Sequence, residues 1–371
     1  MGTSRPPVTE TLLLCGVALS TALGAWFWFT QSPSASGPSI VAAFALASTW
    51  TTLRHNLRSF AFAAWVLTSV ATAMYYPEWF HTWGDWRLTD LISPLIQIIM
   101  FGVGTQLSAA DFLRAFRMPK AVIVGLLCQF GIMPMLGFGL AHLFGFEGEV
   151  AAGIVLIGSC PGGVASNVMA YLARANVALS VTLTALSTLL APFMTPLAMK
   201  LLAGQYVSID FGAMLVSILW MVITPVAVGL IVNRILRDKK RWLDEFLPIV
   251  SMVTIVFILA IITASSREKL LEVGALLVLA AMLHNGIGYL LGYWGAQFFG
   301  LPPSAARVVA IEVGMQNGGM GSALAISVLK SSDAALASAI FGPWMNVSGS
   351  VLASYWRKRL PADEVIPEQV G

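Results

Sequence analysis

Long apolar stretches follow one another along nearly the whole chain, with short polar connections between them. We distinguish twelve, at about residues 11–31, 38–53, 59–76, 90–107, 120–144, 149–173, 176–203, 209–233, 245–265, 270–299, 303–329 and 333–356. A helix of about 20 mostly apolar residues is long enough to cross a bilayer. The pattern therefore predicts an all-α polytopic membrane protein, although the second stretch is too short to decide whether it spans.

The composition agrees with this class of protein. Of the 371 residues 57% are hydrophobic and 11% are charged, whereas about 25% are charged in a soluble domain. The net charge of +3 gives no sign of a nucleic-acid partner. Residues 11–29 resemble the apolar core of a signal peptide, but the stretch is long and lacks a clean cleavage site, so we expect an uncleaved helix. Cys15, Cys128 and Cys160 have neither disulfide nor metal spacing, so we expect small buried hydrophobic residues there.

The Lys and Arg residues in the connections orient the predicted bundle. If the stretch 59–76 starts in the cytoplasm, fifteen of these residues fall on cytoplasmic connections and five on outer ones. The fifteen are Arg54, Arg58, Arg114, Arg117, Lys120, Arg174, Arg234, Arg237, Lys239, Lys240, Arg241, Arg307, Arg357, Lys358 and Arg359, and the five are Arg87, Lys200, Arg267, Lys269 and Lys330. This asymmetry predicts a cytoplasmic C-terminus. A cell (inner) membrane is the expected location, and whether that membrane is bacterial or organellar stays open. The N-terminus lies inside if both extra N-terminal segments cross, and outside if only one does.

A weak internal repeat relates two parts of the chain. When the sequence is shifted by 155 positions, residues 125–145 fall on residues 280–300, and seven of the 21 pairs are identical. At the same shift Gly163 meets Gly318. Because five helices separate the copies and an odd number reverses direction, we expect two inverted five-helix repeats, an arrangement that recurs in transporters.

Two of the apolar stretches contain residues that break helices. "GSCPGGVASN" (158–167) has Pro161 within its apolar run, which removes a helix hydrogen bond. The second stretch, "IEVGMQNGGMGS" (311–322), has four glycines around Gln316 and Asn317. The glycines could instead serve close helix packing, but packing does not require the polar residues beside them. Two broken helices at repeat-related positions indicate a transporter binding site.

Glu312 is an acidic residue well inside an apolar stretch. An ionised carboxylate there is costly unless it is paired, and no Lys or Arg lies at a similar depth, because Arg307 is close to the predicted cytoplasmic end. A bound cation is therefore expected. Oxygen ligands are available from Gln129, Ser166, Asn167, Ser180, Thr184 and Gln316. One carboxylate among neutral oxygens suits Na⁺ better than a divalent ion, which takes more carboxylates.

Simpler roles remain open for several of these side chains. The hydroxyl groups of Ser180 and Thr184 could bond back to their own helix. Gln129 could make an ordinary interhelical hydrogen bond. His284 pairs with Gln129 in the repeat and has no carboxylate neighbour in the sequence, so we expect it to be structural.

Four segments resemble the bile acid:sodium symporter family, with its bacterial and plastid relatives. They are "MFGVGTQLSAADF" (100–112), "QFGIMPMLGFGLA" (129–141), "GSCPGGVASNVMAYLARANVALSVTLTALSTLLAPFMTPL" (158–197) and "EVGMQNGGMGSALA" (312–325). The resemblance covers residues 59–356. It implies ten helices divided into a core and a panel domain, with the two broken helices crossing in the core. The expected organisation is an N-terminal hydrophobic extension (1–58), a transporter unit (59–356) and a polar C-terminal tail (357–371).

The resemblance also implies two sodium sites and an anion site. The first sodium site corresponds to Ser166, Asn167, Ser180, Thr184 and Glu312. The second corresponds to Gln129, Glu312, Val313, Met315 and Gln316, where Val313 and Met315 provide backbone oxygens. The organic anion is expected near Gly163, Val164, Ala165, Asn317 and Asn346. The positions of Val164 and Met345 are often polar in the family, so the apolar residues here argue against a bile acid.

The expected function is therefore sodium-coupled symport of a small organic anion by alternating access. Proton-coupled exchange is an alternative, but the paired Asp residues that would suit it are absent from the apolar stretches. A sensor that keeps the sodium site without transporting remains a second alternative. An enzyme is not expected, because the sequence contains neither H-E-x-x-H nor G-x-S-x-G. The particular anion and the oligomeric state stay open.

Overall fold

The computed structural model describes residues 8–29, 33–54, 58–236, 241–359, 361 and 363. Arg5, Arg237, Lys239, Lys240 and most of the predicted polar tail lie outside the described residues. The chain forms two compact units, one of residues Met1–Thr89 and Ile255–Arg267 and the other of residues Asp90–Thr254 and Glu268–Gly371. We call them the small unit and the large unit and describe each by itself.

The small unit begins with three helices and a short hairpin. They are α1 (Val8–Phe29), α2 (Pro33–Leu53), α3 (Arg58–Tyr75), the 3₁₀ turn Pro77–Phe80 and the strands β1 (Thr82–Trp83) and β2 (Trp86–Arg87). Helix α2 packs between α1 and α3, and the hydroxyl groups of Ser48 and Thr68 lie 2.8 Å apart across the second contact. The two-stranded hairpin is a departure from the expected all-helical chain.

The second half of α12 (Arg241–Ser265) completes the small unit. Ala73 of α3 is buried with Ala260 and Ala264 of α12, and Phe80 packs on them. The expectation that all cysteines are buried is wrong for Cys15, which is exposed, whereas Cys128 and Cys160 are buried. Cys15 lies on α1, which packs on α2, and its side chain points away from that contact.

The large unit contains the remaining helices. They are α4 (Ile92–Gln106), α5 (Ala109–Arg114), α6 (Pro119–Leu143), α7 (Gly148–Ser159), α8 (Ala165–Leu172), α9 (Val177–Ala198), α10 (Phe211–Ile218), α11 (Thr224–Leu236), α13 (Arg267–Phe298), α14 (Pro303–Gly314), α15 (Gly318–Ser327) and α16 (Ser332–Arg357). A π-helical segment, Leu219–Ile223, joins α10 to α11, and another, Met199–Ala203, extends α9.

Six helical segments of the described chain are long and apolar enough to cross a membrane. They are Leu88–Gln106, Pro119–Leu143, Val177–Ala203, Phe211–Leu236, Glu245–Ser265 and Arg267–Phe298. Three shorter apolar helices, Leu13–Leu23, Ala61–Tyr75 and Gly148–Ser159, add to them. The protein is therefore a helical multi-pass membrane protein, as the hydrophobic pattern predicts.

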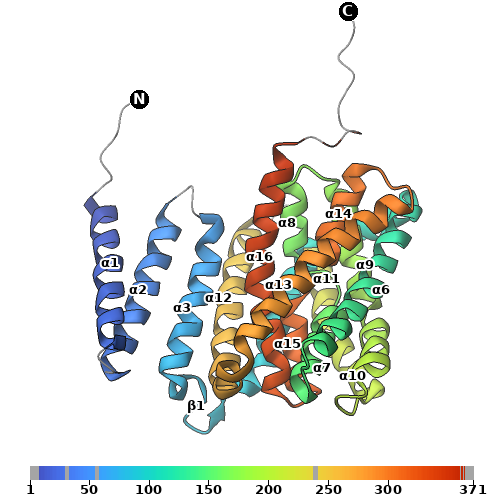
Figure 1. Ribbon diagram of the computed structural model, residues 1–371. Coiled ribbons are helices and arrows are strands. Elements are labelled where there is room, and N and C mark those ends of the chain that lie inside the picture. The colour runs from blue at the N-terminus through green and yellow to red at the C-terminus, as the bar shows by residue number, and fades with distance from the viewer. Residues whose placement is uncertain are drawn as a thin grey trace, which may run out of the picture. The chain divides into compact units, whose positions relative to one another are not determined.

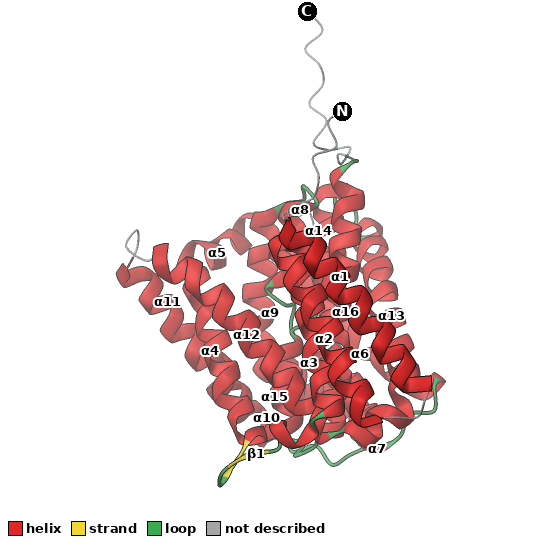
Figure 2. Ribbon diagram, turned by 90° about the vertical axis from the view of Figure 1, so that its left-hand side faces the viewer, coloured by secondary structure: helices red, strands yellow, loops and turns green. Residues whose placement is uncertain are grey.

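Glycines allow α4 and α11 to pack closely (Figure 2). A Cβ atom on Gly104 would overlap the backbone of Val226, and one on Gly229 would overlap the carbonyl of Phe101. Asn233 then donates a hydrogen bond of 2.5 Å from α11 to the carbonyl of Leu107 at the end of α4. The two helices form one side of the large unit.

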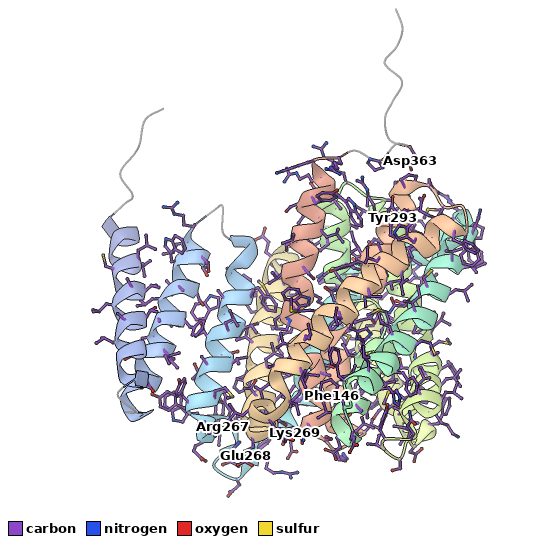
Figure 3. The ribbon with its side chains drawn as sticks, viewed as in Figure 1. Phe146, Arg267, Glu268, Lys269, Tyr293 and Asp363 are labelled. Atoms are coloured by element: carbon purple, nitrogen blue, oxygen red, sulfur yellow. The ribbon has the colours of Figure 1, made fainter. Side chains whose placement is uncertain are left out.

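Helices α6 and α13 end in the same kind of turn. Gly145 and Gly300, which are 155 positions apart, have φ angles of 65° and 70°. In each turn the amide N–H of the following residue donates to the carbonyl five positions earlier, Phe146 to Ala141 and Leu301 to Ala296. These are Schellman-type caps, in which a left-handed glycine satisfies the last carbonyls of a helix. The two helices run in opposite directions, since Phe146, after the end of α6, and Lys269, at the start of α13, both lie in the lower part of the view, with Tyr293 of α13 in the upper part (Figure 3).

Candidate functional site

Both predicted helix breaks are confirmed. The first lies between Ser159, where α7 ends, and Ala165, where α8 begins, and the second lies between Gly314 and Gly318, which bound α14 and α15. Helices α8 and α14 lie in the upper half of the large unit and α7 and α15 in the lower half (Figure 1). The four half-helices therefore meet at two breaks in the middle of the unit.

The two breaks satisfy each other's backbone groups. The N–H of Gly163 donates to the carbonyl of Met315 at 2.8 Å, and the N–H of Asn317 donates to the carbonyl of Pro161 at 2.9 Å. A shift of 154 positions exchanges these two bonds, so the contact has approximate two-fold symmetry. The shift relates Gly163 to Asn317, one residue before the Gly318 that the sequence shift indicates. Unpaired backbone groups in a membrane interior cost several kcal/mol each, and this reciprocal pairing removes part of that cost.

Side chains from the long helices hold three further carbonyls at the breaks. The amide of Gln129 in α6 donates to Cys160 O at 2.9 Å, and the amide of Asn285 in α13 donates to Gly314 O at 2.7 Å. The hydroxyl of Thr195 in α9 donates to Ser159 O at 2.7 Å. The sequence analysis did not identify Asn285 and Thr195. The available signal was the position of each as a polar residue within an apolar helix of a protein that also has broken helices.

Only glycine fits beside the carboxylate at the first break. A Cβ atom on Gly162 would overlap the carboxylate of Glu312, which belongs to the other broken helix. Gly162 also forms an isolated antiparallel bridge with Gln316. The absence of a side chain at residue 162 therefore allows the acidic group of one broken helix to touch the backbone of the other.

Five of the predicted ligand residues form one buried polar cluster. The carboxylate of Glu312, which is 1% exposed, accepts hydrogen bonds from the Ser166 hydroxyl at 2.6 Å and from the Thr184 hydroxyl at 2.8 and 3.0 Å. Asn167 Oδ1 accepts one from Ser180 at 2.8 Å and lies 3.3 Å from Thr184 Oγ1. The cluster joins α8, α9 and α14. The Thr184 hydroxyl also lies 3.1 Å from Ser180 O. The intrahelical bond left open for Thr184 is therefore present in addition to its contact with Glu312.

A second group lies around Gln316. Gln129 Nε2 donates to Gln316 Oε1 at 2.8 Å, and Gln316 Nε2 donates to Val313 O at 2.6 Å. The carbonyl of Met315 accepts a hydrogen bond from the N–H of Gly163. Gln129 Oε1 is buried and has no hydrogen-bond partner. The group thus contains an oxygen atom that is shielded from water and still able to accept a ligand, which is unusual for a buried polar atom.

The residues expected near an anion lie at the start of α8, at the start of α15 and in α16. Gly163 is buried, and Val164 and Ala165 are half-buried. Asn317 caps α15 by accepting a hydrogen bond from Met320 N at 3.0 Å. Asn346 is half-buried in α16 and donates to Gly342 O at 2.8 Å. The side chain of Val164, the N-cap residue of α8, makes no capping hydrogen bond.

Two other polar residues have structural partners. His284 is buried and its Nε2 lies 2.9 Å from Met133 O, as expected for a structural residue. Arg307, counted above among the connections, lies within α14 and is 7% exposed. Its guanidinium donates to Arg359 O at 2.7 Å and to Trp356 O at 3.3 Å. It therefore links the segment at the end of α16 to the second turn of α14.

The cluster around Glu312 has the chemistry of a site for an alkali cation. Its donors are one carboxylate, hydroxyl oxygens and an amide oxygen, all of them hard oxygen ligands. Asp111 and Glu272 form ion pairs with Arg114 and Lys269, whereas the hydrogen bonds to the Glu312 carboxylate come from the neutral hydroxyl groups of Ser166 and Thr184. The described residues also contain no group of three His, Cys, Asp or Glu side chains, which a transition metal would favour. A buried carboxylate without a cationic partner fits a monovalent metal ion.

A multi-pass helical protein whose two broken helices meet around such a carboxylate is a membrane transporter, not an enzyme. The sequence comparisons define it further. The Sodium Bile acid symporter family matches residues 93–273, and the chain is 43% identical over 299 residues to the "Uncharacterized sodium-dependent transporter YocS" of Bacillus subtilis (strain 168), covering 81% of this chain and 91% of the relative. The chain belongs to the sodium bile acid symporter family.

Two other relatives show how wide the similarity is. The "Probable sodium/metabolite cotransporter BASS1, chloroplastic" of Oryza sativa subsp. japonica is 34% identical over 311 residues, covering 82% of this chain and 74% of the relative. The "Ileal sodium/bile acid cotransporter" of Oryctolagus cuniculus is 34% identical over 236 residues, covering 62% of this chain and 67% of the relative.

Proposed function

We propose that the protein is a sodium-coupled symporter that imports a small organic anion. The observation that carries this proposal is the carboxylate of Glu312, buried at the contact between the two broken helices and touched by the hydroxyl groups of Ser166 and Thr184. An ionised carboxylate in such a place needs a cation. The sodium-dependent relatives, YocS among them, support Na⁺ as that cation.

We propose two sodium ions. The first is held by Ser166, Asn167, Ser180, Thr184 and Glu312, all of which already lie in one cluster. The second is held by Gln129, Glu312, Val313, Met315 and Gln316. Its support is the buried and unpartnered Oε1 of Gln129, together with the backbone oxygens of the second break. Sodium is cargo here, so both ions must leave the site in every cycle.

The anion is proposed to lie at the start of α8, among Gly163, Val164, Ala165, Asn317 and Asn346. The positive end of a helix dipole favours a carboxylate. No side chain caps this end of α8, and the N–H groups of Ser166 and Asn167 donate to the carbonyls of Gly163 and Val164. Val164 and Met345 are apolar and offer no hydrogen bond to a hydroxylated ligand. We therefore expect a small monocarboxylate in preference to a sterol acid.

Alternating access is proposed to arise from two inverted repeats. The support is the pair of exchanged backbone bonds at the breaks and the matching caps after α6 and α13. A further pair supports it, since Asn176 and Ser331, 155 positions apart, cap α9 and α16 through their side chains. The distribution of Lys and Arg favours a cell (inner) membrane with the C-terminus in the cytoplasm.

Flux measurements on the full-length protein in liposomes test this function. An inward Na⁺ gradient should drive uptake of at least one member of a panel of radiolabelled short carboxylates, and an equal K⁺ gradient should not. A pH gradient without Na⁺ is the control for proton-coupled exchange. Sodium-dependent binding of a carboxylate with no flux would favour a sensor and refute transport.

A further inference from the structure

A buried chain of hydrogen bonds links the second helix break to α16. It begins at Gly314, whose carbonyl accepts the amide N–H of Asn285 at 2.7 Å. The other end of the same amide, Asn285 Oδ1, accepts the hydroxyl of Ser348 at 2.5 Å. The Tyr289 hydroxyl lies 3.3 Å from Ser348 Oγ and 3.4 Å from Met345 O. The chain thus runs from α14 through α13 to α16.

The two ends of this chain adjoin residues with different proposed roles. Gly314 lies between Val313 and Met315, which are proposed to give backbone oxygens to the second sodium ion. Met345 lies beside Asn346, which is proposed to face the organic anion. The chain therefore joins the backbone of the proposed sodium site to the part of α16 that is proposed to contact the substrate.

Packing around the chain leaves little freedom for independent motion. A Cβ atom on Gly349 of α16 would lie 2.9 Å from the sulfur of Met315 and 3.2 Å from the hydroxyl of Tyr289. A Cβ atom on Gly314 would overlap the Tyr289 ring. Because close-packed interiors transmit small displacements, a shift of the Gly314–Met315 backbone also displaces Tyr289 or α16.

Satisfying the broken backbone does not require the whole chain. The bond from Asn285 alone satisfies the carbonyl of Gly314. The hydroxyl of Ser348 has an alternative acceptor in its own helix, Met345 O at 3.2 Å. Ser350, two residues further along α16, makes an intrahelical bond of this kind, to Asn346 O at 2.8 Å. The shorter hydrogen bond of Ser348 is the one to Asn285 Oδ1 in α13. Ser348 therefore links two helices, although an acceptor in its own helix was within reach.

We propose that Asn285, Ser348 and Tyr289 are positioning residues that couple sodium at the second break to the substrate-facing part of α16. The inference rests on the proposed sodium function and adds the route by which the ion orders the anion site. Fully satisfied buried polar networks fix one arrangement of the groups they join. Sodium that fixes the Gly314–Met315 backbone therefore also fixes Asn285, and through it Ser348 and α16.

Hydrogen–deuterium exchange with Na⁺ alone as the probe tests the coupling without knowledge of the substrate. Purified full-length protein is compared in NaCl and KCl of equal concentration, and exchange is followed in peptides over α14–α15 and over residues 340–352 of α16. Ser348→Ala is the test variant, because it leaves the bond from Asn285 to Gly314 intact. Ser350→Ala is the matched control, since the hydroxyl it removes bonds to Asn346 O of the same helix and lies 3.8 Å from the Met169 sulfur of α8, and does not reach α13.

We expect Na⁺ to slow exchange in both regions of the wild type and of Ser350→Ala. In Ser348→Ala the protection of α14–α15 should remain, and the protection of α16 should be lost. Tyr289→Phe, which keeps the ring packing and removes the hydroxyl, should lose part of the α16 protection and provides an independent test should Ser348→Ala not fold.

The outcomes separate this inference from the proposed function. Protection of α14–α15 in every protein, with equal α16 protection in Ser348→Ala and the wild type, refutes the coupling and leaves the sodium site standing. Equal loss in Ser348→Ala and Ser350→Ala also refutes it, because the effect would then not depend on the link to α13. No Na⁺-dependent protection anywhere in the wild type refutes the sodium site and the coupling together.

Discussion

The Glu312→Gln substitution should remove sodium binding and leave the fold intact. Glutamine keeps the size of the side chain, and its carbonyl oxygen can accept the hydroxyl that Ser166 or Thr184 now donates to the carboxylate. Its amide N–H groups can donate to the oxygen of the other hydroxyl. A neutral amide is also cheaper to bury than an ionised carboxylate. The variant should therefore insert and fold like the wild type.

The expected size of the effect follows from the charge. Two unit charges about 4 Å apart interact by about 4 kcal/mol at the effective dielectric constant of about 20 that suits protein sites. A loss of this size weakens sodium binding roughly a thousandfold. At a Na⁺ concentration of about 100 times the wild-type Kd, the wild type gains about 2.7 kcal/mol of stability. The variant at the same concentration should gain less than about 0.1 kcal/mol.

A thermal-shift titration with NaCl, with KCl at equal ionic strength as reference, measures this difference. Sodium-driven uptake in liposomes should fall with it. Glu149→Gln is the control, because Glu149 also accepts a serine hydroxyl, that of Ser331 at 2.5 Å, but lies outside the cluster. Its sodium response should equal that of the wild type. A normal sodium shift in Glu312→Gln would show that the carboxylate is structural and that the proposed sodium sites are wrong.

Four further outcomes are expected. Na⁺ should raise the melting temperature of the wild type more than K⁺ or choline does, and equal values in the three salts would contradict a selective site. Ser166→Ala and Thr184→Ala should each weaken sodium binding less than Glu312→Gln, by about ten- to a hundredfold, because each removes one neutral oxygen ligand, whose contact with a charged group is worth about 1.5–3 kcal/mol; a larger loss in a thermal-shift titration would contradict this order. Met345→His should shift binding toward more hydroxylated carboxylates in a thermal-shift panel, and an unchanged preference would remove Met345 from the anion site. Thr195→Val should lower the free energy of unfolding by about 1–3 kcal/mol by leaving Ser159 O unpaired, while the Na⁺ shift stays the same; a lost shift would give Thr195 a role in binding.

The hydrophobic pattern and the composition predicted the class of fold, because a bilayer imposes a length and a polarity on every spanning helix. The two breaks could also be predicted, since Pro161 and the glycines at 162 and 163 have a direct effect on backbone geometry. The grouping of Ser166, Thr184 and Glu312 rested on the resemblance to the family, because residues so far apart in the sequence have no local signal that they meet.

Other features depend on which side of a helix faces inward, which the sequence does not state. Asn285 and Thr195 hold break carbonyls, but an isolated polar residue in an apolar helix gives no indication of its partner. Arg307 was assigned to a connection because its distance from the helix end is short, and its burial depends on the end of α16 folding over it. Cys15 is exposed although it lies in an apolar helix that packs on α2, because the sequence does not state which face of α1 that contact covers.

The residue types around Glu312 suit a site that must hold an ion and then release it. A hydroxyl can donate its hydrogen to the carboxylate and still offer a lone pair of its oxygen to a cation. Ser166 and Thr184 make the first of these contacts here, so the binding of Na⁺ would not require the cluster to come apart. Asn167 Oδ1, which accepts the hydroxyl of Ser180, has a second lone pair in the same way. When the ion leaves, the hydroxyl bonds still compensate part of the cost of the buried charge, and α8, α9 and α14 stay joined. Lys or Arg in place of these hydroxyls would neutralise Glu312 permanently and compete with the cargo, which explains why a transporter would surround this carboxylate with neutral oxygens.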